Sequence, residues 1–155
     1  MPGWSDYLEG QVVNHIFRAV NIVAPGANVY VALATTAPTD ATTGTTIVEP
    51  VGNNYSRTAV STTGGWDAPT TGATANTAAI TFPVPSGSWG TCTHFAIISA
   101  ATLGNVLFHA ALDTSVAPAN GDTVRFAAGA LDINIDTAAG EMTDTNLLRA
   151  ISEDR

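Results

Sequence analysis

The chain has 155 residues, of which 45% are hydrophobic and only 12% are charged, well below the usual charged fraction of about 25%. This composition excludes disorder that is driven by high charge and low hydrophobicity, and the length predicts one domain. Thirteen acids oppose five arginines, with no lysine, so the net charge is −8. Because there is no basic cluster, we expect the chain to bind neither nucleic acid nor an anionic membrane surface.

Cys92 is the single cysteine, which excludes an intramolecular disulfide and a metal site built from cysteines. We expect it to be a small buried side chain. No apolar run reaches the roughly 18–20 residues of a membrane-spanning helix, and the segment after Met1 lacks the features of a secretory signal. We therefore expect the protein to be made in a cytoplasm and to stay soluble there.

The first predicted element is a helix over residues 5–20. Ser5 is a suitable N-cap, and Asp6 and Glu9 would lie near the positive end of the helix dipole. Apolar residues recur at spacings of three and four, and Ala24-Pro25-Gly26 ends the pattern. The apolar stripe, which must bury against the domain or a neighbouring subunit, contains Leu8, Val12, Val13, Ile16, Phe17 and Ala19 or Val20.

Short segments rich in β-forming residues follow, separated by turn signals. Residues 91–99 and 106–112 predict a hairpin with a loop of about six residues. Long loops are predicted at 35–46, 62–77 and 113–122. We therefore predict one mainly β domain over residues 1–136, an antiparallel β-sandwich or jelly-roll-like barrel with one N-terminal helix. The predicted strands are 29–34, 55–61, 79–82, 91–99, 106–112, 123–127 and 131–136.

Residues 137–155 are predicted to be a C-terminal arm that is either flexible or docked on a partner. Residues 144–152 can form two helical turns, which are unstable alone in water. The apolar side chains of Leu147, Leu148 and Ile151 would then make the contacts to the partner.

Two sets of polar residues are candidates for chemistry. In the predicted hairpin, His94 and His109 would lie diagonally on one face and begin a metal site, but no third ligand is evident. The alternative is that both are ordinary hydrogen-bonded strand residues. Asp132, Asn134 and Asp136 would line one face of a strand, where they can bind Ca²⁺ weakly or act in acid–base chemistry. A half-exposed strand has the same pattern, so this signal is weak.

Motifs for nucleophilic catalysis and for phosphate binding are missing from the sequence. There is no G-x-S-x-G turn, and a P-loop is excluded because the chain has no lysine. We therefore predict that the protein is not an enzyme and uses no cofactor.

Trp66 and Trp89 lie beside glycines in predicted loops. An exposed indole in such a loop can stack on a sugar ring or enter a protein–protein contact. The third possibility is that each tryptophan anchors its loop in the core of the domain itself.

Four stretches together resemble a family of small virion proteins of tailed bacteriophages, in the same order along the chain. The resemblance runs from about Gly3 to Asp136, and no catalytic residue comes with it. Members of the family carry both tail-fibre and head-decoration labels. The four stretches are Gly3–Glu9 with the helix that follows, Val29–Pro38, Ser88–Phe95 through Leu107–Ala110, and Gly121–Phe126 through Asp132.

The resemblance implies a virion protein, and we favour a capsid decoration (cement) protein that binds the outer surface of the head and stabilises the shell. Its partners would be the major capsid protein and further copies of itself, as a homotrimer. The alternative is a tail-tip or fibre-associated module that binds host glycans through its tryptophan loops. The candidate partner contacts are Trp4, Trp66, Trp89, Leu147, Leu148 and Ile151.

Overall fold

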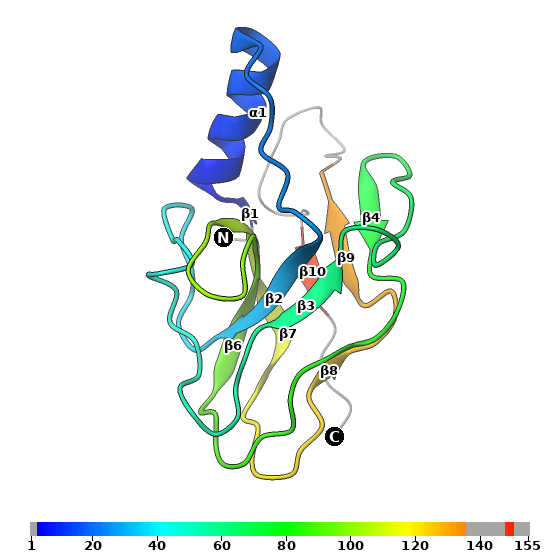
Figure 1. Cartoon of the computed structure of the whole chain (residues 1–155). Helices are drawn as coiled ribbons and strands as arrows, with labels where there is room; N and C mark the ends of the chain where they lie inside the picture. Colours follow the sequence, from blue (N-terminus) through cyan, green and yellow to red (C-terminus); the bar gives the residue numbers. More distant parts are fainter. Residues whose placement is uncertain (1–2, 136–147, 151–155) are drawn as a thin grey trace.

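The structure, a computed structural model, describes residues 3–135 and the backbone of residues 148–150 (Figure 1). One helix lies near the N-terminus, and the other elements are strands. In chain order the elements are β1 (Gly3–Trp4), α1 (Asp6–Arg18), β2 (Asn28–Ala34), β3 (Thr58–Ser61), β4 (Ala73–Ala75), β5 (Ile80–Thr81), β6 (Cys92–Ile98), β7 (Val106–Val116), β8 (Arg125–Phe126), β9 (Leu131–Asn134) and β10 (Leu148–Ala150).

The largest sheet has five strands in the order β1-β7-β6-β2-β3, and the described pairings are antiparallel. The predicted hairpin is confirmed, because β6 and β7 pair directly, with Phe95 opposite Ala110 and Ile97 opposite Phe108. The turn between the two strands is closed by a hydrogen bond from the N–H of Ser99 to the carbonyl of Asn105 at 3.0 Å.

Two small sheets, β10-β9-β4 and β5-β8, complete a sandwich-like arrangement with the large sheet. Strand alternation turns Leu33, Phe95 and Leu112 toward one core, to which Phe126 and Leu131 contribute from the small sheets. The opposite face of β2 and β6 is also buried, in a second cluster against Ile47, which lies in the connection between β2 and β3. The predicted mainly β sandwich with an N-terminal helix is confirmed, and the described strands form separate sheets rather than a closed barrel.

Some predicted boundaries are wrong. Residues 55–57 precede β3 instead of belonging to it. The region 62–77, predicted as a loop, contains β4 and a bridge between Trp66 and Asn76. β7 continues to Val116, past the predicted loop start at Asp113, because a register shift in β6 allows Cys92 to pair with Val116.

Helical turns were also predicted over residues 144–152, but Leu148–Ala150 is a strand that pairs with β9. The rest of the predicted C-terminal arm, including Leu147 and Ile151, lies outside the described residues.

Candidate functional site

The N-terminal helix begins on the edge of the large sheet. β1 pairs with β7, so that Trp4 lies opposite Phe108, with the rings in edge-to-face contact at 5.9 Å. Trp4 is half-buried, and its indole N–H has no hydrogen-bond partner among the described residues. The ring therefore packs against its own sheet, beside the start of α1.

Ser5 fixes the helix to the body, in the N-cap position that the sequence predicted. Its hydroxyl donates to the carbonyl of Val106 and accepts a hydrogen bond from the N–H of Leu8 at 3.2 Å. Next to it, the N–H of Asp6 donates to the carbonyl of Asp40 at 2.9 Å. The direction of α1 relative to the sheet is thus set by hydrogen bonds to β7 and to the connection between β2 and β3.

α1 ends at Arg18, and Ala19 adopts the left-handed conformation that often ends helices, with a φ of 54°. The chain then returns beside the helix to β2 (Figure 1). Two bonds hold the returning segment: the N–H of Val23 donates to Gln11 Oε1 at 3.1 Å, and the ring of His15 donates to the carbonyl of Val20 at 3.1 Å. Gln11 and His15 lie one turn apart on the polar side of α1. The returning segment therefore holds the polar side of α1.

The apolar side of α1 lies in solvent. No residue of the helix is fully buried, and only Tyr7 and Leu8 in its first turn pack against the core. We call residues 6–23, which comprise α1 and the returning segment, the N-terminal arm. Its exposed large apolar side chains are Val13 (53%), Ile16 (64%), Phe17 (79%), Val20 (49%), Ile22 (43%) and Val23 (66%). Beyond Leu8, most of the predicted stripe is thus left exposed by the part of the chain that the structure describes, as expected of a surface that meets another chain.

The tryptophans of the two predicted loops are anchored in the core. Trp89 is only 3% exposed, and its indole N–H donates to the carbonyl of Asn53 at 2.8 Å. Its ring contacts those of Tyr55 and Phe82. Trp66 is half-buried and packs against the same core. Trp89 therefore presents no exposed indole in this conformation, which favours the possibility that it anchors its loop in the core of the domain.

The candidate contacts of the C-terminal arm are described for one residue alone. Leu148 lies in β10, where its backbone is opposite Ile133 of β9.

His94 and His109 lie diagonally on neighbouring strands, as predicted: His94 is opposite Ala111, and His109 is opposite Ala96. His109 is buried, and its Nε2 is 3.1 Å from Oδ1 of Asp40. Burial lowers the pKa of His94, and a positive charge on the neighbouring His109 lowers it further. Among the described residues, no group of three or more His, Cys, Asp or Glu side chains is placed to hold a metal ion.

The second polar candidate lies on β9. Leu131 and Ile133 are buried, and Asp132 and Asn134 between them are half-exposed, which is the pattern of an ordinary half-buried strand. Asp136 lies outside the described residues.

A buried ionic cluster that the sequence did not reveal ties several loops together. Arg57, whose side chain is 5% exposed, donates to both carboxylate oxygens of Glu49, the shortest distance being 2.7 Å. The hydroxyl of Tyr55 donates to Glu49 at 2.8 Å. Burial and the charge of Glu49 raise the pKa of Tyr55 far above its usual value. The remaining donors of Arg57 bind the carbonyls of Gly44, Ala100 and Leu103.

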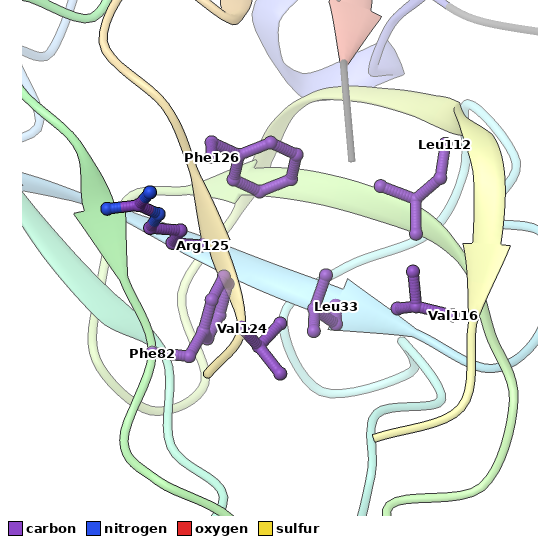
Figure 2. A pocket seen from close by; sticks show the side chains of 7 residues that line it. All are labelled: Leu33, Phe82, Leu112, Val116, Val124, Arg125 and Phe126. Carbon is purple, nitrogen blue, oxygen red and sulfur yellow. The ribbon is translucent and has the colours of Figure 1, made fainter. Parts of the chain in front are cut away.

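A small cavity of about 10 Å³, at the lower limit for a single water molecule, lies among the described core residues (Figure 2). Apolar side chains from both layers of the sandwich face one another around it, while the guanidinium of Arg125 points away. Cys92 is also buried, which raises the pKa of its thiol to about 11, so the thiol is a poor nucleophile. Neither feature offers a site for a cofactor or for covalent chemistry.

Comparison with known proteins identifies a phage family. Residues 3–134 match the model of a family described as podophage GP4 fiber I protein gp80. No curated protein matches the chain. The matched range includes the N-terminal arm and the described strands other than β10. Within residues 3–135 and 148–150, no helix combines the length and the apolar character that crossing a membrane requires.

Proposed function

Because the chain belongs to the family of the podophage GP4 fiber I protein gp80, and is thus a structural protein of a tailed phage, we propose that it is a subunit of a phage fibre. The proposed role is structural: the subunit binds other subunits of the fibre, which requires no catalysis. The family description supports a fibre more directly than the decoration of a capsid, which the sequence alone favoured.

The observation that carries this proposal is the exposed apolar side of the N-terminal arm. A protein that works alone in solution rarely leaves large apolar side chains side by side in water. Here the bonds of Ser5 and Asp6 hold the arm away from the body, and the returning segment occupies the polar side of the helix. These features suit a subunit whose exposed apolar side chains are covered by other subunits after assembly.

The glycan-binding alternative loses support from the burial of Trp89, since stacking on a sugar needs an exposed indole. This supports a role in the assembly of the fibre over the recognition of a sugar. A contact with the major capsid protein stays a prediction that the following experiment also tests.

The experiment is immunogold electron microscopy of intact virions with antibody raised against the purified chain. Gold on the fibres, with heads labelled no more than after pre-immune serum, is the expected result. Gold spread evenly over the heads would refute the fibre role and restore the decoration role. Absence of gold, with the chain also absent from purified virions by mass spectrometry, would refute both.

A further inference from the structure

We infer that the apolar side of α1 binds α1 of further copies of this chain, so that the N-terminal arms form a helical bundle. The inference rests on the proposed function, and the partner of the exposed apolar side of the arm is then a second copy of the chain. Four observations carry it: few side chains of the helix pack on the body, its apolar side is wide, that side carries no charge, and the base of the arm is fixed.

The helix has too little support to be stable by itself. It has 13 residues and no fully buried side chain, whereas isolated helices shorter than about 12–15 residues are marginal in water. Gly10 lies in its middle and lowers its intrinsic stability further. Packing of its apolar side against other chains would supply the stability that the body does not provide.

The width of the apolar side indicates a bundle of helices rather than a simple pair. Successive residues of a helix are rotated by about 100° around its axis. Around the circumference, the apolar side chains therefore follow one another in the order Val12, Ile16, Val13 and Phe17. Together they span about 140°. A two-stranded coiled coil uses a narrower seam, whereas a wide apolar side can contact two neighbours at once. Phe17, at one flank of this side, is 79% exposed and would lie between neighbouring helices.

The distribution of charge favours identical copies over another partner. The middle of the helix, residues 10–17, contains no Asp, Glu, Lys or Arg, and the charged residues Asp6, Glu9 and Arg18 lie toward its ends. Copies of an acidic protein repel each other least where they carry no charge, and the apolar side of α1 is such a place. This stretch of the helix also offers no charge that would attract a charged partner.

The arm is also positioned before it binds. The hydrogen bonds of Ser5 and Asp6 at its base, and those of Gln11 and His15 to the returning segment, are made within one chain. Association therefore does not have to fix where the arm leaves the body, which lowers its entropic cost.

The test is the mass of the purified full-length chain in solution, measured by light scattering and by sedimentation over a range of concentrations. We expect an oligomer, with a mass that is a multiple of 15.8 kDa; its copy number tests the homotrimer that the sequence resemblance implies. We expect Ile16→Ser and Phe17→Ser to weaken self-association by about 100-fold each, because each removes a large apolar side chain from the bundle.

The matched control is Val51→Ser, because Val51 is 90% exposed on the body and lies outside the arm. This variant should keep the mass of the wild type, and circular dichroism should show that all variants are folded. A second test uses Phe17→Cys, which should form disulfide-linked dimers on oxidation while Val51→Cys does not; the native Cys92 is buried and does not interfere.

A wild-type chain that is monomeric at all concentrations would overturn the inference, as would a Phe17→Ser variant with unchanged self-association. The two proposals fail separately. A monomeric chain found on fibres by immunogold would leave the proposed function intact. An oligomer formed through α1 but found on heads would refute the fibre role and leave the bundle standing.

Discussion

Removal of the Arg57 side chain tests whether the buried ionic cluster holds the loops together. Arg57→Met keeps the length and the apolar stem of the side chain but removes its donors. The carboxylate of Glu49, whose side chain is 17% exposed, would lose its charged partner. Three loop carbonyls, those of Gly44, Ala100 and Leu103, would lose their donor at the same time.

The expected loss is large compared with the stability of a domain of this size. Breaking a buried ion pair by removing one partner costs about 3–5 kcal/mol, because an uncompensated charge remains buried. Domains are usually stable by about 5–15 kcal/mol, so the variant should still fold but unfold at much lower denaturant concentration. Arg57→Met combined with Glu49→Gln should cost less than the sum of the two single changes, by about 1–3 kcal/mol.

Urea unfolding followed by tryptophan fluorescence measures these free energies, since Trp89 lies in the core. The slope of the transition should be similar in the wild type, both single variants and the double variant. A loss below about 1 kcal/mol for Arg57→Met, or strictly additive effects, would refute the role of the cluster, because a surface ion pair behaves in that way.

Three further predictions concern single side chains. Ser5→Ala should lower the free energy of unfolding by about 2 kcal/mol in urea titrations, because it removes an N-cap and a donor to β7; a loss below about 0.5 kcal/mol would contradict this. The pKa of His94 is lowered from 6.5 in the folded chain, so the unfolded chain binds more protons and stability should fall as the pH drops below about 6.5. His94→Gln should reduce the loss of thermal stability between about pH 7 and pH 5, and an unchanged loss would refute the assignment. The thiol of Cys92, with a pKa of about 11, should react with a disulfide reagent at least about 100-fold more slowly in the native chain than in urea; equal rates would show that it is accessible.

The parts of the fold that the sequence predicted correctly rest on local periodicity. Ser5 and the residues that follow it combine an N-cap with apolar spacings of three and four, and α1 forms there. The hairpin of β6 and β7 was predictable because two long β-forming segments are joined by a short turn. In both cases the signal lies within about 25 residues of sequence and needs no knowledge of the rest of the chain.

The errors arose where distant residues decide the structure. The sequence pattern predicts that Tyr55 and Arg57 belong to a strand. Instead, Tyr55 accepts a hydrogen bond from the backbone of Leu33, Arg57 pairs with Glu49, and β3 begins after both residues. β10 is a strand because β9 offers a partner edge, which no local pattern of residues 148–150 reveals.

Partner residues across long separations were equally hidden from the sequence. Asp40 is 69 residues from His109, with which it pairs, and lies in a loop without periodicity. The exposure of the tryptophans was also not predictable, because a loop beside glycines can either stand out or fold inward. The N-terminal stripe was predictable as apolar, whereas its exposure over the described residues became visible only in the structure.

Incorporation of the chain into virions tests most directly whether the protein assembles through its N-terminal arm. A phage that lacks the gene for this chain would be complemented with the wild type, with Ile16→Ser combined with Phe17→Ser, or with Val51→Ser. The amount of chain per purified particle would then be measured by quantitative mass spectrometry. We predict at least about a tenfold loss for the arm variant and an amount equal to the wild type for Val51→Ser. Incorporation of the folded arm variant at the wild-type level would contradict the proposed assembly.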